Sequence, residues 1–266
     1  MEEFRMTNEY RTILTDEILH FLYRNASFQA LEEEQQQILL AKFKHEPLFK
    51  EVVEISIALE EMIEEVEATL PKIQDKDFLF PQEQQKLLLK NRTVTCGNVL
   101  YVPFDEMENL YSPMIVIVQQ SDSMSEYESF SKGTILPLFN LCALQKRDLI
   151  ILPFSHTIAE PLIFKKGALQ ITLFERFLYK HLNGNAQIVP ALQKALDLFD
   201  QDKINNQRDL MIITDNQFND FQPLIESDFT ERLRELSIDI SVIAMSETDF
   251  EVQPIPFADK VFFANE

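Results

Sequence analysis

The sequence contains no tryptophan, only two cysteines and only four glycines among its 266 residues. The cysteines, Cys96 and Cys142, lie far apart and form no CxxC pair, so neither a disulfide framework nor a zinc site is expected. The glycines form neither a phosphate-binding loop nor a G-x-S-x-G elbow. These absences argue against Walker-type nucleotide binding and against the usual α/β-hydrolase nucleophile.

Basic residues are also scarce: 24 lysines and arginines stand against 44 acids, and the net charge is −20. Such a charge repels phosphate backbones and anionic lipid, so neither nucleic acid nor a membrane surface is expected as a partner. The first residues lack a basic segment followed by an apolar core, and no apolar run is long enough to span a bilayer. We therefore expect a cytoplasmic protein with reduced thiols.

With 45% hydrophobic residues the chain can build a substantial core, and residues 1–92 read as a helical N-terminal region. Its clearest helix has an apolar stripe at helical spacing, made of Val52, Ile55, Leu59, Met62 and Val66. Proline 71 should end that helix, and "QEQQKLLLK" at 82–90 predicts a later one. Glutamates lie off the stripe. We interpret them as a solvated face, and a docking surface for a basic partner is the alternative.

Residues 93–111 are predicted to form a β-hairpin or a linker. The stretch "TVTCGNVLYVPF" alternates β-branched and polar residues around Gly97-Asn98, which predicts two short strands joined by a primed turn.

From residue 112 to 266, apolar runs alternate with helical segments. Buried strands are predicted at 114–118, 149–154, 210–214 and 240–245, and helices at 129–144, 169–182, 188–199 and 223–236. "EPLIFKKG" predicts an antiparallel edge strand and "KVFFA" a last short strand. Because strands that are apolar on both faces need helices on both sides, the fold class is α/β with a doubly wound, mostly parallel sheet.

Polar residues follow three of these strands, in "QQSDSMS", "PFSH" and "TDNQ". Ligands bind at the carboxyl ends of such strands, so Ser121, Ser123, His156 and Asp215 should meet at one rim. A serine with His156 and Asp215 would suit a small hydrolase. In the competing structural interpretation, a serine or Asp122 caps the helix that follows.

The order of these motifs resembles the von Willebrand factor A domain over residues 112–266. The resemblance lies in a strand leading into "QQSDSMS", a strand ending in "FS", the loop "NGNAQIVPAL" before a helix, and a strand ending in "TDN". It implies a Rossmann-like fold and a metal-ion-dependent adhesion site. That family carries Asp-x-Ser-x-Ser after its first strand, a threonine in a Gly-rich loop and a later aspartate.

Carried over by position, the metal site is degenerate. Ser121, Ser123 and Asp215 match the family's ligands, while Gln119 replaces the first aspartate and Ala186 replaces the threonine. Mg²⁺ prefers anionic oxygen ligands, so exchanging a carboxylate for an amide should leave an affinity too weak for routine occupancy. No cofactor is expected, and weak Mg²⁺ binding is the one exception left open.

The preferred hypothesis is a non-catalytic protein–protein interaction module rather than an enzyme. A helical region followed by a domain of this type is similar to the prokaryotic partners of MoxR-type AAA+ ATPases, and the similarity implies an adaptor role in assembly or maturation of another complex. The alternatives are the hydrolase with a Ser/His/Asp rim and a weak Mg²⁺-dependent ligand-binding domain.

Overall fold

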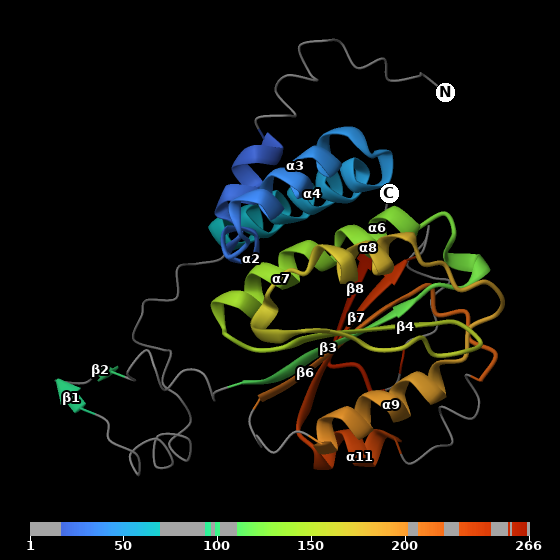
Figure 1. Ribbon diagram of the computed structural model, residues 1–266. Coiled ribbons are helices and arrows are strands. Elements are labelled where there is room, and N and C mark those ends of the chain that lie inside the picture. Colours follow the sequence, from blue (N-terminus) through green and yellow to red (C-terminus); the bar gives the residue numbers. More distant parts are fainter. Residues whose placement is uncertain are drawn as a thin grey trace.

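The computed structural model describes residues 17–69, 94–96, 99–101, 111–201, 207–220, 229–245, 255 and 257–264. Its centre is a six-stranded sheet in the order β5-β4-β3-β6-β7-β8 (Figure 1). The strands of this sheet are β3 (Tyr111–Gln119), β4 (Leu149–Phe154), β5 (Leu162–Phe164), β6 (Gln207–Thr214), β7 (Ile238–Met245) and β8 (Lys260–Ala264). All neighbours pair in parallel except β4 and β5, which are antiparallel.

This sheet confirms the predicted α/β class. All four buried runs lie in β3, β4, β6 and β7, and β4 has the predicted bounds. "EPLIFKKG" contains the antiparallel edge strand β5, and "KVFFA" is the opposite edge strand β8. Strand β3 has β4 on one side and β6 on the other, so the strand order reverses beside it. In open α/β sheets this reversal marks the place where loops separate and a site can form.

Helices cover both faces of the sheet (Figure 1). One face carries α6 (Glu128–Gly133), α7 (Ile135–Leu144) and α8 (Ile171–Tyr179). The other carries α9 (Ile188–Gln201) and α11 (Phe229–Glu235). Each face has its own buried cluster, because alternate residues of β3 point to opposite sides: Val116 belongs to one cluster, and Ile115 and Ile117 to the other.

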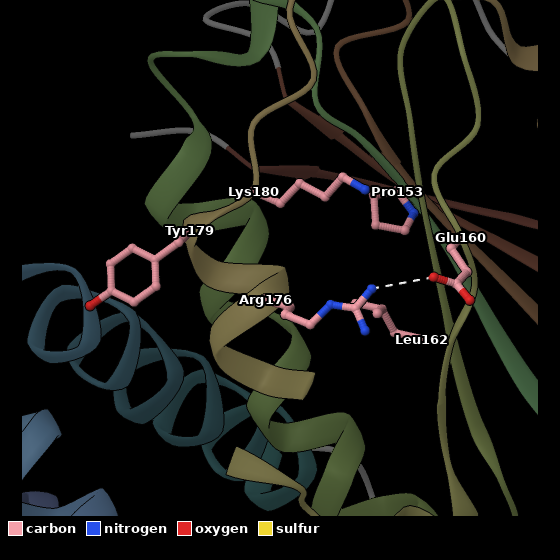
Figure 2. Close-up of a pocket in the computed structure, with 6 residues that line it drawn as sticks. All are labelled: Pro153, Glu160, Leu162, Arg176, Tyr179 and Lys180. Atoms are coloured by element: carbon pink, nitrogen blue, oxygen red, sulfur yellow. Dashed lines mark hydrogen bonds and ion pairs between the residues drawn. The ribbon is translucent and has the colours of Figure 1, made fainter. Parts of the chain in front are cut away.

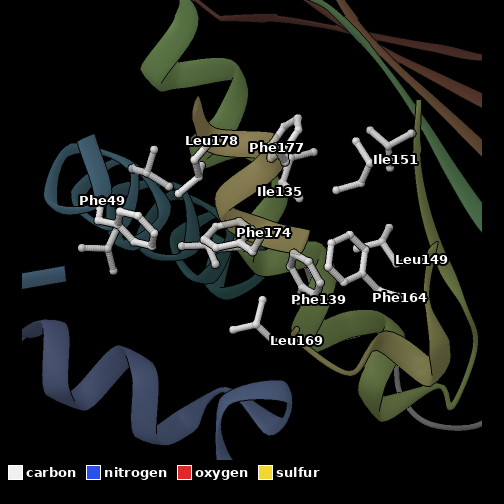
Figure 3. Close-up of a cluster of buried hydrophobic side chains, with 14 of the residues drawn as sticks. Phe49, Ile135, Phe139, Leu149, Ile151, Phe164, Leu169, Phe174, Phe177 and Leu178 are labelled. Carbon is white, nitrogen blue, oxygen red and sulfur yellow. The ribbon is translucent and has the colours of Figure 1, made fainter. Parts of the chain in front are cut away.

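A further layer, made of α2 (Ala26–Gln29), α3 (Glu33–His45) and α4 (Pro47–Thr69), lies outside α6, α7 and α8 (Figure 1). Figure 3 shows Phe49 of α4 facing Phe174 of α8, whose ring centroid is 6.0 Å away. The ring centroid of Phe174 in turn lies 5.7 Å from that of Phe139 of α7. The N-terminal helices and one face of the sheet therefore share a single hydrophobic core.

Buried hydroxyl groups tie the same two layers together. The Ser27 hydroxyl lies 2.8 Å from the carbonyl oxygen of Phe139 and 2.6 Å from that of Gly167. The Ser56 hydroxyl lies 2.6 Å from the carbonyl oxygen of Gly133. A Cβ on Gly133 would stand 2.6 Å from Cγ2 of Ile55, so glycine at that position allows α4 to approach α6 closely.

Some predicted elements have different limits in the structure. The helix predicted at 129–144 is two helices, α6 and α7, and they meet at Thr134, whose hydroxyl donates to the Ser131 carbonyl at 2.8 Å. Helix α8 is shorter than the predicted 169–182. Strands β1 (Val94–Cys96) and β2 (Val99–Tyr101) pair antiparallel where the hairpin is predicted, and they form a sheet of their own.

Other predictions fall outside the described residues, namely the end of α4 at Pro71, the helix at 82–90, the Gly97-Asn98 turn and the first part of the helix predicted at 223–236. The domain limits near residues 92 and 112 stay predictions. Within the part of the chain that the structure describes, no helix combines the length and apolar character needed to cross a membrane.

Candidate functional site: the rim beside β3

Three loops meet at the carboxyl-terminal end of the sheet. Residues 120–125 leave β3, residues 155–157 leave β4 and residues 215–217 leave β6. Because these strands are parallel neighbours, their ends lie at one edge, and the reversal of strand order lies between them. The predicted rim residues are therefore on the same edge of the fold.

The side chain of Gln119 lies at the centre of this rim. Its amide nitrogen Nε2 is 2.6 Å from the Ser121 hydroxyl oxygen, 2.8 Å from Oδ1 of Asp215 and 3.3 Å from the Ser123 hydroxyl oxygen. The two serine hydroxyls lie 2.9 Å apart. One amide group thus gathers the three predicted ligand residues into a single hydrogen-bonded cluster.

The turn after β6 fixes the orientation of that amide. The Thr214 hydroxyl donates to Oε1 of Gln119, so the amide's acceptor faces β6 and its donor faces the serines. Asn216 has a positive φ of 62°, a conformation that asparagine tolerates better than most residues. This turn directs the Gln217 backbone N–H to Oδ1 of Asp215 at 2.9 Å and the Asn216 N–H to the Thr214 hydroxyl at 2.8 Å.

Most of the cluster is buried, so each of its hydrogen bonds offsets the cost of removing a polar group from water. Gln119 is fully buried, Ser121 is 1% exposed and Asp215 is 7% exposed, whereas Ser123 is exposed. A buried carboxylate is costly unless it accepts hydrogen bonds, and Oδ1 of Asp215 accepts two. Its other oxygen, Oδ2, is buried and has no hydrogen-bond partner among the described residues. Within that part of the chain the cluster therefore retains one unused acceptor.

The donor set of the cluster does not fit a resident divalent ion. Mg²⁺ requires oxygen ligands at about 2.0–2.1 Å in octahedral geometry. Here the group nearest to the serine and aspartate oxygens is an N–H₂ donor, whose hydrogens carry partial positive charge and provide no lone pair. Among the described residues no group of three His, Cys, Asp or Glu side chains is suited to hold a metal ion. Weak Mg²⁺ binding stays a prediction.

Ala186 lies in the loop that borders the rim. It is 1% exposed, forms a bridge with Phe218, and its carbonyl oxygen accepts from the Asn219 N–H at 2.9 Å. The same loop meets the serine segment, because the Asp122 N–H donates to the Gly184 carbonyl oxygen at 3.1 Å. A methyl side chain at position 186 contributes no oxygen ligand.

His156 lies on the rim, and its hydrogen-bond contacts are with residues outside the cluster. Its Nδ1 is 3.0 Å from the Asn183 carbonyl oxygen and 3.3 Å from the Ser155 hydroxyl oxygen. Within the described residues no hydrogen bond joins His156 to the two serines or to Asp215. The three residue types of the hydrolase alternative are thus present on one edge without the hydrogen bonds that would connect them as a relay.

The prediction that the side chain of a serine or of Asp122 caps the helix that follows is wrong. The short 3₁₀ helix η2 (Asp122–Met124) begins after Ser121, but that hydroxyl makes no capping hydrogen bond. Helix α6 begins after Tyr127, also without a side-chain cap. The hydroxyl oxygens of Ser121 and Ser123 instead accept hydrogen bonds from the Gln119 amide nitrogen.

Two buried groups outside the rim have shifted pKa values. Burial raises the pKa of the Cys142 thiol to about 11, so this cysteine stays protonated and unreactive at neutral pH. Burial also lowers the pKa of Lys132, against the opposing effect of its contact with Glu128. Lys132 donates to the Leu178 carbonyl oxygen as well, so it joins α6 to the end of α8.

Two residues of the rim region were missed from the sequence, Thr214 and Asp220. The signal for Thr214 was a hydroxyl residue that ends an apolar strand. Asp220 caps α9 from outside that helix: its two carboxylate oxygens accept from the Ile188 N–H at 2.9 Å and the Val189 N–H at 2.8 Å. A cap contributed from 31 or 32 residues away leaves no local pattern in the sequence.

We expect Asp220→Ala to reduce the free energy of unfolding by about 1–2 kcal/mol, because two N–H groups at the start of α9 lose their acceptor and the favourable charge at the helix N-terminus. Chemical denaturation measures the loss. Asp220→Asn keeps one acceptor oxygen and should recover part of it. Equal stability of the alanine variant and the wild type would contradict the role of Asp220 as a cap.

No protein-family model matches the sequence, and no curated protein matches it. Among solved structures, the VWA domain of SpRpn10 aligns with a TM-score of 0.44 at 12% identity, over 59% of this chain and 88% of that one. Manganese-loaded TRAP protein of Plasmodium vivax aligns with a TM-score of 0.44 at 14% identity, over 59% of this chain and 69% of that one. An aerotolerance-related membrane protein of Bacteroides fragilis aligns with a TM-score of 0.40 at 12% identity, over 50% of this chain and 67% of that one.

Proposed function

We propose that this protein is a non-catalytic protein–protein interaction module of the von Willebrand factor A type, whose rim keeps its shape without a metal ion. The observation that carries the proposal is the position of the Gln119 amide nitrogen, within 2.6–3.3 Å of the three residues that match the family's ligands. An internal N–H₂ group supports these oxygens as a cation would, but it adds no net charge.

The proposal rests on what the rim offers to a second protein. Ser123 and Asp122 are exposed at its surface, and the buried cluster beneath fixes the position of the Ser123 hydroxyl. A rim preorganised by its own side chains loses little conformational entropy on binding. Contact with a partner should therefore be independent of divalent ions.

We further propose that the partner is a MoxR-type AAA+ ATPase and that the protein acts in the cytoplasm as an adaptor in assembly or maturation of another complex. Two features support this assignment. The order of motifs resembles the vWA family, and a helical layer packs on the α/β fold through a shared core. That layer and the rim give the adaptor two surfaces, one for the ATPase and one for a client.

Binding of the purified protein to a purified MoxR-type AAA+ ATPase tests the assignment. In nucleotide-free buffer, association measured with Mg²⁺ and with chelator should agree within about twofold, since the rim needs no ion. The oligomeric state of the ATPase, followed by light scattering in both buffers, is the control. Loss of binding on chelation with an intact ATPase oligomer would show a metal-dependent rim, and no association in either buffer would reject the adaptor role.

A further inference from the structure

A cavity of about 250 Å³ opens between the edge of the sheet and α8 (Figure 2). Its lining residues come from β4, the segment before β5, β5 itself and the end of α8; they are Pro153, Glu160, Leu162, Arg176, Tyr179 and Lys180. The floor is apolar, because it is made of the buried side chains of Pro153 and Leu162. Figure 2 shows the Arg176 and Lys180 side chains extending from α8 across this floor.

The polar wall of the cavity is basic, although the whole protein carries a charge of −20. Lys180 makes no ion pair or hydrogen bond with any of the described residues. Within the described part of the chain, Arg176 has one ion pair, with Glu160 at 3.3 Å between Nη2 and Oε2. Both side chains of that pair are largely exposed, 56% for Arg176 and 79% for Glu160. Exposed pairs of this kind are weak, so Glu160 is readily displaced.

Glu160 shows which chemistry the cavity accepts. Its carboxylate pairs with the Arg176 guanidinium, and the Lys180 side chain extends toward Pro153 in the same cavity (Figure 2). A guanidinium binds a carboxylate through paired N–H donors, and a nearby ammonium adds a second point of attraction. The internal carboxylate therefore occupies the position that an external one would take.

The size of the cavity suits a single side chain. Sites for drug-sized ligands and cofactors usually measure about 300–1,000 Å³. A glutamate or aspartate side chain fits such a space.

One wall of the cavity is held by the N-terminal helical layer. The Tyr179 hydroxyl donates to the Glu46 carboxylate, and the Tyr179 ring lies 6.1 Å from that of Phe49. Lys42 pairs with Glu46 at 2.7 Å and with Glu175 of α8 at 2.8 Å. These contacts hold the end of α8, which carries Arg176 and leads into Lys180, against the helical layer.

The cavity also borders the rim. Pro153 pairs with Val118 and Phe154 pairs with Gln119, so the cavity wall and the central glutamine lie on neighbouring strands at the same end of the sheet. We propose that the cavity is a docking site for an acidic side chain of the protein partner that binds the rim. The proposal rests on the interaction role proposed above, and it names the chemistry that this partner contributes.

A titration of the isotope-labelled full-length protein with acetyl-glutamate amide, followed by NMR, tests the cavity without the partner. Amide signals of Leu162, Arg176 and Lys180 should shift and saturate, and acetyl-glutamine amide, which lacks the charge, should bind at least about fivefold more weakly. Arg176→Gln should weaken binding about fivefold, while Glu160→Gln, which removes the internal competitor, should strengthen it about twofold.

Arg232→Gln is the matched control, because Arg232 is a partly exposed arginine in an ion pair with Asp200 on the other face of the sheet. This variant should bind the probe as the wild type does. Equal losses in Arg176→Gln and Arg232→Gln would overturn the proposal, as would equal binding of the two amides. Inorganic phosphate is a further arm, and binding tighter than that of acetyl-glutamate amide would reject a carboxylate as the ligand. Failure here leaves metal-independent association intact, so the two proposals are separable.

Discussion

Replacing Gln119 with aspartate should create a divalent-cation site at the rim. The substitution removes the N–H₂ group from the centre of the cluster and places a carboxylate beside the Asp215 carboxylate and the two serine hydroxyls. Mg²⁺ and Mn²⁺ favour such a set of anionic and neutral oxygens. Calorimetric titration should show Mn²⁺ affinity rising by at least about tenfold, which corresponds to about 1.4 kcal/mol.

Ser125→Asp is the matched control, because it adds the same charge on the same loop at an exposed position outside the cluster. It should leave metal binding unchanged. Adding Ala186→Thr to Gln119→Asp supplies one more hydroxyl from the neighbouring loop and should strengthen binding further. If Gln119→Asp folds normally and gains no affinity over Ser125→Asp, the alignment of this loop with the family's metal site is mistaken.

Phe49→Ala should lower the free energy of unfolding more than the other proposed variants. Phe49 is fully buried in α4 and contacts Phe43 of α3 at 5.5 Å and Phe174 of α8 at 6.0 Å between ring centroids. Removing a buried phenyl group leaves a cavity and typically costs about 3–5 kcal/mol. Because the N-terminal helices share their core with the α/β fold, Phe49→Ala should lower the midpoint of a single unfolding transition measured by denaturant titration.

Ile38→Ala is the control for that experiment. Ile38 belongs to α3 but is 45% exposed, so its truncation should change the free energy of unfolding by no more than about 0.5 kcal/mol. Two separate transitions, with only one of them shifted by Phe49→Ala, would contradict the shared core and would make the helical layer an independent unit.

The sheet was predictable from the sequence because its strands are apolar on both faces. The runs "MIVIV", "LIILPF", "LMIIT" and "ISVIAM" are too short for buried helices and rich in β-branched residues, and all are strands. Polar residues at their ends then indicated the rim. The packing of α4 was less accessible, because periodicity identifies an apolar face without naming the surface that covers it.

The cluster was predicted in its members but not in its arrangement. Ser121, Ser123 and Asp215 do meet, and the Gln119 amide nitrogen lies beside all three. The sequence alone indicates only that Gln119 replaces the aspartate of the family's motif and so removes a carboxylate. The structure shows an amide whose two ends are both used, and the direction of its N–H₂ group depends on Thr214, which comes from a strand 95 residues away. Long-range pairing of this kind has no local signature.

The most direct test of a rim that is held by its own glutamine is the titration of wild-type protein with Mn²⁺, followed by the electron paramagnetic resonance signal of the free ion. If the Gln119 amide fills the centre of the cluster, the wild-type protein should take up no Mn²⁺. The signal of the free ion should then rise with added Mn²⁺ equally in titrations of the wild type and of the Asp215→Ala variant. Uptake of one Mn²⁺ per chain that the Asp215→Ala variant abolishes would contradict the account.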